Sequence, residues 1–266
     1  MKRTSMALAV LAAALAVPAL AAQDDFHWQG TVAPGGAVEI KGVNGGITAS
    51  SAAGGAVEVT AVKKGRKSDP ARVKVEVVEH AGGVTICAVY PSVDGNANTC
   101  APGKGGRMNV RDNDVQVEFQ VKVPAGVRFV GRTVNGGISA SRLAADIEAE
   151  TVNGGVDLDS NGTARASTVN GGITARMGRG DWDGDLKLST VNGGIELTLP
   201  EGLNTEVRAT TVNGGVETDF PVAVSGRVSR RSLTGTIGSG GRRLELSTVN
   251  GGVTLRKAGA KDPAGR

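Results

Sequence analysis

The chain has 266 residues, with 30 Lys and Arg against 26 Asp and Glu and a formal net charge of +4. That surplus is too small to predict nucleic-acid binding. The chain has 41 Gly but only two Trp, one Tyr and four Phe, which does not favour a thick globular core, and a thin core of stacked aliphatic side chains is expected instead.

Residues 1–22 have the features of a secretory signal peptide. Lys2 and Arg3 precede an apolar run over residues 6–20, and Ala19, Leu20 and Ala21 provide a small-x-small cleavage site. The apolar run is short for a membrane span, which needs about 20 residues. We therefore expect a mature chain with no membrane span, located in the periplasm or secreted to the cell surface, with residues 23–35 leading into the fold.

Residues 36–128 are expected to form a β-rich N-terminal part of the fold. Alternating apolar residues occur over 57–62, 73–77, 84–89 and 115–123, which is typical of half-buried strands. Between the last two runs, residues 91–114 are rich in Gly, Asn and Asp and are long enough to be a loop insertion.

The two cysteines, Cys87 and Cys100, lie just before this insertion and inside it. Oxidising compartments favour disulfides, and closing so short a loop contributes about 3 kcal/mol to stability. We predict a Cys87–Cys100 disulfide. The chain has only two histidines, His27 and His80, and the cysteine spacing does not fit a zinc site.

Residues 129–257 contain a tandem repeat of Thr-Val-Asn-Gly-Gly, which also has an earlier copy. Units of 16 to 22 residues separate successive copies if a degraded copy at residues 232–237 places Thr234 in the asparagine position. Such a period predicts one supersecondary unit per repeat. The repeated asparagines are Asn44, Asn135, Asn153, Asn170, Asn192, Asn213 and Asn250.

The spacing of apolar residues on either side of the repeat predicts that each copy is a corner. Leu188 and Thr190 before it, and Ile195 and Leu197 after it, belong to period-two patterns with one apolar face. Thr190 and Ile195 are an odd five residues apart, so the chain must bend between them if both face inward. Asn and Gly tolerate positive φ, which suits such a bend.

Asn-Gly is also typical of two-residue hairpins, so a meander of hairpins is the competing interpretation. Recurrence of nearly identical corners favours a solenoid, in which like stacks on like and the asparagines form a hydrogen-bonded ladder. The predicted fold is all-β: a single-stranded β-solenoid built from TVNGG-cornered coils, followed by a disordered tail at 258–266.

The order of these segments resembles a known family. VEIKGVNGGI is followed by VEVTAVKKG, a variable middle, VQVEFQVKVPAGV and then the tandem TVNGG repeats, which together cover residues 36–257. This order is similar to the bacterial "putative adhesin" β-solenoid family. The resemblance implies a single-stranded β-solenoid at the cell envelope or surface and supplies no catalytic residues. The insertion with its two cysteines departs from the family pattern.

One acidic cluster is a candidate surface site. It comprises Asp181, Trp182, Asp183 and Asp185 in a variable link between repeats. Carboxylates there have two functional interpretations, as calcium ligands or as the acid pair of a carbohydrate-active enzyme with Trp182 beside them. We favour the structural interpretation, a polar turn whose Trp182 covers the end of the core.

These observations favour an exported, non-enzymatic module of the cell envelope with an adhesive, binding or structural role. We assign no catalytic, cofactor-binding or metal-binding residue. An envelope polysaccharide or another envelope protein is the expected partner. The alternatives are a carbohydrate-active enzyme at Asp181–Asp185 and an envelope-stress accessory protein. Function is expected where repeats differ, in the 91–114 loop and in the links at 159–163, 178–185, 200–205 and 221–231.

Overall fold

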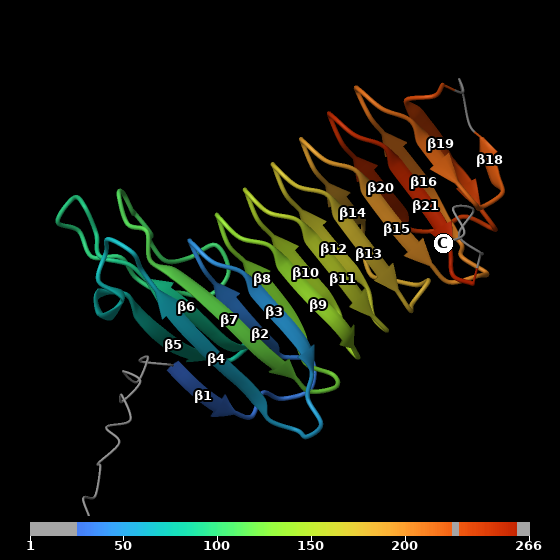
Figure 1. Ribbon diagram of the computed structural model, residues 1–266. Helices are drawn as coiled ribbons and strands as arrows, with labels where there is room; N and C mark the ends of the chain where they lie inside the picture. The colour runs from blue at the N-terminus through green and yellow to red at the C-terminus, as the bar shows by residue number, and fades with distance from the viewer. Residues whose placement is uncertain (1–25, 225–228, 260–266) are drawn as a thin grey trace, which may run out of the picture.

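The structure is a computed structural model that describes residues 26–224 and 229–259. Two β-sheets enclose one apolar core along the described part of the chain (Figure 1). No helix within it is long and apolar enough to cross a membrane. The expected signal peptide, at 1–22, lies outside the described residues, as do residues 260–266 of the expected tail.

Each sheet has a spatial strand order that differs from the order along the chain. Sheet A has the order β1 (Phe26–Gly30), β4 (Val57–Lys64), β7 (Gln116–Val123), β3 (Ile47–Ser51), β9 (Ile138–Leu143), β11 (Val156–Ser160), β13 (Ile173–Met177), β15 (Ile195–Leu199), β21 (Val253–Lys257), β17 (Val216–Thr218). Sheet B has the order β18 (Val222–Val224), β19 (Ser232–Ile237), β16 (Thr205–Thr210), β20 (Arg243–Ser247), β14 (Leu186–Ser189), β12 (Ala164–Ser167), β10 (Ile147–Glu150), β8 (Arg128–Arg132), β2 (Ala37–Lys41), β6 (Gly83–Val89), β5 (Lys74–His80). A 3-10 turn, η1 (Pro70–Arg72), lies between β4 and β5.

Each repeat forms one coil, consisting of a strand of sheet B, a Val-Asn-Gly-Gly corner and a strand of sheet A. We name each coil after its corner asparagine. In the Asn192 coil, β14 ends at Ser189 and β15 begins at Ile195. Neighbouring coils pair in parallel and in register, with a bridge between successive corner asparagines. The predicted all-β solenoid is confirmed.

The coil faces follow the period-two pattern of the sequence. Leu188, Thr190 and Ile195 are all buried, while Lys187 and Glu196 are exposed. Because of the bend at the corner, side chains an odd number of residues apart, on either side of it, both point into the core. Aliphatic side chains at equivalent positions of successive coils stack on one another and fill the narrow space between the sheets. A chain with few aromatic residues can therefore form a continuous core.

Two hydrogen-bonded columns hold the corners together. The side-chain Nδ2 of each corner asparagine donates to Oδ1 of the next at 2.7–2.9 Å, which forms the predicted ladder in the order Asn213, Asn250, Asn192, Asn170, Asn153, Asn135, Asn44. A buried threonine precedes each of the six corners from Asn135 onward, and its Oγ1 donates to a glycine carbonyl of the adjacent coil at 2.8–3.0 Å. Every coil thus satisfies polar groups of its neighbour.

The corner glycines are required chiefly because the backbones of adjacent coils approach closely. The sequence had suggested a different reason, the tolerance of Asn and Gly for positive φ. The asparagines have no positive φ, and among the first corner glycines positive φ is found at only some coils. A Cβ placed on Gly171 would lie 2.1 Å from the carbonyl oxygen of Gly154, and the same contact recurs up the stack. Backbone packing between coils, rather than left-handed conformation, therefore excludes side chains at these positions.

The N-terminal part is less regular than a solenoid. The Asn44 coil stacks directly on the Asn135 coil, although 91 residues separate their corners. Residues between them extend the sheets past the Asn44 coil: β6 and β7 pair in parallel with β2 and β3, whereas β1, β4 and β5 pair antiparallel. Antiparallel strands therefore cover this end of the stack (Figure 1).

The expected degraded coil at Thr234 is wrong. Strand β19 runs antiparallel to β16, and Thr234 lies opposite Arg208 within a sheet instead of at a corner. The 37-residue gap is therefore a hairpin excursion. The Asn250 coil then returns and sits between the Asn192 and Asn213 coils, so the spatial order of the last three coils differs from their sequence order. Sequence period detects repeats but contains no information on which repeats become neighbours.

Candidate binding site

The 91–114 loop leaves the stack where a corner would otherwise form. Strand β6 ends at Val89 and β7 begins at Gln116, and Tyr90 takes over contacts that a corner would make. The Tyr90 hydroxyl donates to the carbonyl of Val115 at 2.8 Å and accepts from the backbone N–H of Asn44 at 3.4 Å. Burial raises the pKa of Tyr90 to about 12, so the hydroxyl remains a donor.

The asparagine ladder ends at the same loop. Nδ2 of Asn44 donates to the carbonyl of Asn113 at 3.0 Å, so the last amide of the ladder is satisfied by the loop backbone. The loop therefore continues the hydrogen bonding of the stack without supplying another corner.

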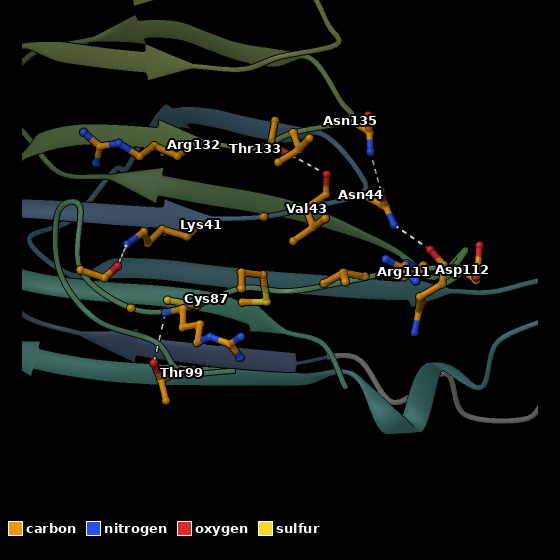
Figure 2. A pocket seen from close by; sticks show the side chains of 18 residues that line it. Lys41, Val43, Asn44, Cys87, Thr99, Arg111, Asp112, Arg132, Thr133 and Asn135 are labelled. Carbon is orange, nitrogen blue, oxygen red and sulfur yellow. Dashed lines mark hydrogen bonds between the residues drawn. The ribbon is translucent and has the colours of Figure 1, made fainter. Parts of the chain in front are cut away.

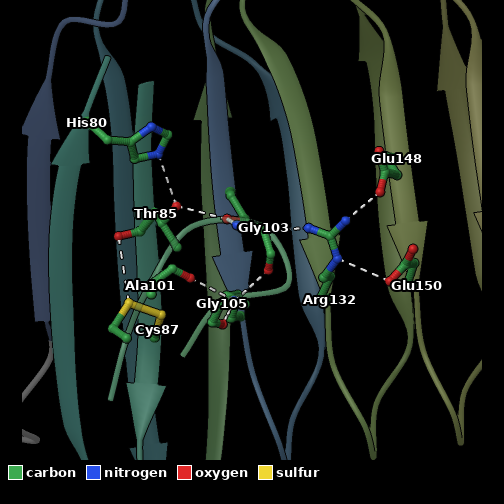
Figure 3. Close-up of polar contacts among 12 residues, drawn as sticks. His80, Thr85, Cys87, Ala101, Gly103, Gly105, Arg132, Glu148 and Glu150 are labelled. Carbon is green, nitrogen blue, oxygen red and sulfur yellow. Dashed lines mark hydrogen bonds and ion pairs between the residues drawn. A yellow bond between two sulfur atoms is a disulfide. The ribbon is translucent and has the colours of Figure 1, made fainter. Parts of the chain in front are cut away.

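Three groups on the outer face of sheet B fix the middle of the loop (Figure 3). Cys87 on β6 and Cys100 in the loop form a disulfide. Nζ of Lys41 donates to the carbonyls of Ala101, Gly103 and Gly105 at 2.8, 2.7 and 2.8 Å. These contacts hold the loop backbone across β2 and β6.

The carboxylate of Glu39, the third of these groups, lies beneath this part of the loop. It points away from the core yet is only 5% exposed, because the loop covers it. One oxygen accepts from the N–H of Gly103 at 2.9 Å and from the Thr85 hydroxyl at 2.8 Å. The other forms an ion pair with Arg132 on β8. A carboxylate with so many partners is fully satisfied despite its burial.

Arg132 extends this network across the next two strands. Its guanidinium contacts Glu39 on β2 and both Glu148 and Glu150 on β10, the last at 3.1 Å (Figure 3). Such a bridge across three strands fixes the orientation of the Arg132 side chain.

The parts of the loop on either side of this middle segment are hydrogen-bonded to each other. Asp94 forms an ion pair with Arg107 and accepts from Nδ2 of Asn109 at 2.9 Å. The Arg107 guanidinium holds the pKa of Asp94 well below its usual range. The Asn98 side chain binds the backbone of Asn109 on both sides, accepting from its N–H at 2.7 Å and donating to its carbonyl at 3.1 Å. The loop is a defined structure rather than an open coil.

A cavity of about 550 Å³ lies between this loop and the corners of the Asn44 and Asn135 coils (Figure 2). Its apolar lining comes from Val43, Met108, Val110, Val134 and Cys87. Its charged lining consists of four cations, Lys41, Arg107, Arg111 and Arg132, and one anion, Asp112. Asp112 has a φ of +51°, which is uncommon for a residue other than glycine and marks local backbone strain at the rim.

The acidic cluster predicted from the sequence lies in the link between β13 and β14, beside a cavity of about 620 Å³. Asp181 pairs with Arg179 at 3.3 Å, and Asp183 pairs with Arg242. Each arginine lowers the pKa of its partner carboxyl. A glycosidase general acid needs a raised pKa, so these carboxyls do not match that role.

Trp182 and the backbone of Asp185 also have partners within the protein. Trp182 is buried against the core, and its Nε1 donates to the carbonyl of Arg243 at 3.4 Å. It therefore covers the core, as the structural interpretation predicts, and offers no free ring face to a sugar. The carbonyl of Asp185 accepts from Arg165 at 3.4 Å. In the described part of the chain, no group of three His, Cys, Asp or Glu side chains is arranged to hold a metal ion.

The sequence indicated the loop and its cysteines, but it missed most of the cavity wall. Glu39, Lys41 and Arg132 occupy outward positions of ordinary alternating strands, and nothing in that pattern shows that a loop some 60 residues later covers two of them. Val134 is the ordinary corner valine of its repeat. Only its position next to the loop makes it part of the cavity.

Comparison with known proteins gives a family and several related structures. No curated protein matches the chain. The crystal structure of a "putative cell adhesion protein" from Clostridium sporogenes ATCC 15579 shares 12% identity, with a TM-score of 0.43, over 88% of this chain and 99% of that one. A "putative adhesin" from Bacteroides fragilis NCTC 9343 shares 10% identity, with a TM-score of 0.32, over 88% and 97% of the two chains.

The family match covers the tandem coils. Residues 133–256 match the model of the Toastrack DUF4097 family, and they run from the threonine before the Asn135 corner to the end of the last coil in the sequence. This match confirms the family resemblance seen in the sequence. The stacked coils with corners Asn135, Asn153, Asn170, Asn192, Asn213 and Asn250 are therefore the part of the chain that is similar to the Toastrack DUF4097 family.

Proposed function

We propose that this protein is an exported, non-enzymatic binding module of the cell envelope, and that the cavity under the 91–114 loop is its ligand site. The carrying observation is that the regular stack is broken at one corner by a loop that is anchored through a disulfide, through Lys41 and through Glu39. A site held in shape before binding loses little conformational entropy on binding.

Two further features support this proposal. The disulfide favours a location in an oxidising compartment, in agreement with the expected signal peptide. The cavity combines an apolar wall with a few charged groups, which is the usual composition of a ligand site. The partner is a component of the envelope, either a polysaccharide or another protein.

A bulky side chain in the cavity tests the proposal. Val134 lines the cavity and is 39% exposed, and Val191 has the same exposure at the equivalent corner of another coil. Because a Trp at position 134 fills the space, we expect Val134→Trp to weaken binding at least about tenfold, whereas Val191→Trp leaves it unchanged.

The measurement is binding of each purified variant to two immobilised fractions, envelope polysaccharide and solubilised envelope proteins. Thermal unfolding of both variants checks that they are equally folded. The assignment of this cavity as the ligand site is contradicted if the wild type binds and both substituted variants bind equally well. It is also contradicted if the wild type binds neither fraction.

A further inference from the structure

The loop segment that follows the isolated antiparallel bridge between Thr99 and Arg107 has one unpaired backbone edge. Arg107 pairs with Thr99 through two backbone hydrogen bonds, of 3.2 and 2.9 Å, and the Asn98 side chain binds both backbone groups of Asn109. In an extended chain, the backbone polar groups of successive residues point to opposite edges. The N–H and C=O groups of Met108 and Val110 therefore point away from the part of the loop that satisfies Arg107 and Asn109.

Those four backbone groups form no backbone–backbone hydrogen bond among residues 26–224 and 229–259. An unpaired strand edge is a template for another extended chain, which adds to it through backbone hydrogen bonds. Both residues line the cavity, with the Met108 side chain 37% exposed and Val110 packed partly against the core. The open edge and the apolar wall thus belong to the same site.

The lining of the cavity has four cations and one anion, Asp112, and this excess of positive charge favours an acidic ligand. Of its four lining cations, Arg107 and Arg132 are paired with carboxylates outside the lining, and Lys41 binds three loop carbonyls. Arg111 is exposed and forms no ion pair within the described residues, and it lies beside the open edge. A carboxylate on the ligand would complement this guanidinium.

The lining contains no Phe, Tyr or Trp. Aromatic rings provide the flat apolar surface on which the face of a sugar ring packs, so this cavity is poorly suited to a polysaccharide. Its features, a row of backbone donors and acceptors beside aliphatic side chains, suit a polypeptide.

We propose that the cavity binds an extended, acidic peptide segment of a partner protein, which pairs with the backbone of Met108 and Val110 and places a carboxylate against Arg111. This rests on the proposed function and identifies the partner class of the same site. Alternate residues of the peptide face the valine wall, because side chains alternate along a strand.

Phage-displayed random peptides provide the first test. The full mature chain is the target, and Val134→Trp protein is used to remove peptides that bind elsewhere. Selected peptides are then synthesised, and their affinities are measured by calorimetry. We expect sequences with at least one Asp or Glu among apolar residues. Methylating a backbone nitrogen of the peptide at alternate positions removes a donor to the edge, and each such change is expected to weaken binding about tenfold.

A matched pair of substitutions tests the charge. Arg111→Gln is expected to weaken binding of the selected peptide about threefold to tenfold. Arg176, on the outer face of sheet A, is likewise exposed and has no ion pair within the described residues, so Arg176→Gln is the control and should leave binding unchanged.

The outcomes separate this inference from the proposed function. The peptide assignment is overturned if no peptide is selected. It is also overturned if methylating the backbone nitrogens of the odd-numbered or of the even-numbered peptide residues leaves the affinity unchanged in both cases. If envelope polysaccharide then binds and Val134→Trp abolishes that binding, the cavity is still the ligand site but its ligand is a glycan. If every ligand that binds the wild type binds the Val134→Trp variant equally well, both the proposed function and the peptide assignment are overturned.

Discussion

At the scale of single residues, each position of the corner meets a different physical requirement. The threonine faces inward and satisfies a glycine carbonyl of the adjacent coil, and the asparagine amide joins the ladder. The valine between them is 38–54% exposed at the tandem corners. The first glycine allows the two backbones to touch. Repetition of the motif therefore follows from stacking, with no need for repeated binding sites.

Substitution of one corner glycine tests this account. In Gly171→Ala, the new Cβ would lie 2.1 Å from the carbonyl oxygen of Gly154, so the coils must separate. We expect the free energy of unfolding in urea to fall by roughly 1–3 kcal/mol or more. Gly55→Ala is the control, because no atom lies within 4 Å of a Cβ there, and its unfolding free energy should change little. Equal effects at the two positions would contradict the close-approach explanation.

At the scale of elements, the 91–114 loop ends at a residue that organises a second turn. Both carboxylate oxygens of Asp114 accept backbone hydrogen bonds, from Ser68 at 2.8 Å, Lys67 at 2.9 Å and Arg66 at 3.2 Å. These donors, Ser68 foremost, lower the pKa of Asp114 from 3.8 to about 2. The end of the insertion is thereby tied to the turn between β4 and η1.

This depressed pKa predicts an acid-sensitive turn. A carboxyl whose pKa is lower in the folded state stabilises the turn above pH 3.8, and that contribution is lost as the pH falls towards about 2. The amide resonances of residues 66–68, followed by NMR from about pH 5 to about pH 1.5, should therefore shift with a midpoint near 2. In Asp114→Asn this transition should be absent. A midpoint in the wild type close to the ordinary value of 3.8 would show that the carboxylate does not accept these bonds in solution.

At the scale of the whole molecule, the C-terminal coil joins two parts of the stack. Strands β20 and β21 of the Asn250 coil lie between the Asn192 and Asn213 coils in both sheets (Figure 1). β17 pairs with β21, and sheet A continues no further past β17 among the described strands. The strand pairing of the Asn213 coil therefore depends on a segment that follows it in the chain.

Truncation after Gly241 tests this dependence. It removes β20 and β21, so β17 loses its strand partner and β16 keeps only the antiparallel β19. We expect hydrogen exchange measured by mass spectrometry to show lost protection throughout residues 205–237. Coils in a stack contact only their neighbours, so the Asn153 coil serves as an internal control and should remain protected. Retained protection over 205–237 would mean that this region folds without the last coil.

The sequence by itself determined the local geometry of this protein. Period-two patterns specified which residues face the core, and the odd step from Thr190 to Ile195 required a bend at every Val-Asn-Gly-Gly. One cysteine lies just before the insertion that breaks the pattern and the other lies within it, and in the structure they are joined. These properties depend on residues close together in the chain, whose spacing can be read directly.

Only the tertiary structure decided which coils are neighbours and what covers their outer faces. Nearly identical corners stack equally well on one another, so the repeat cannot specify that the Asn250 coil precedes the Asn213 coil, or that Thr234 belongs to an antiparallel strand. The covering of Glu39 by Gly103 and the pairing of Asp183 with Arg242 join residues about 60 apart. Contacts of that kind depend on the path of the links, and the cavity exists because of that path.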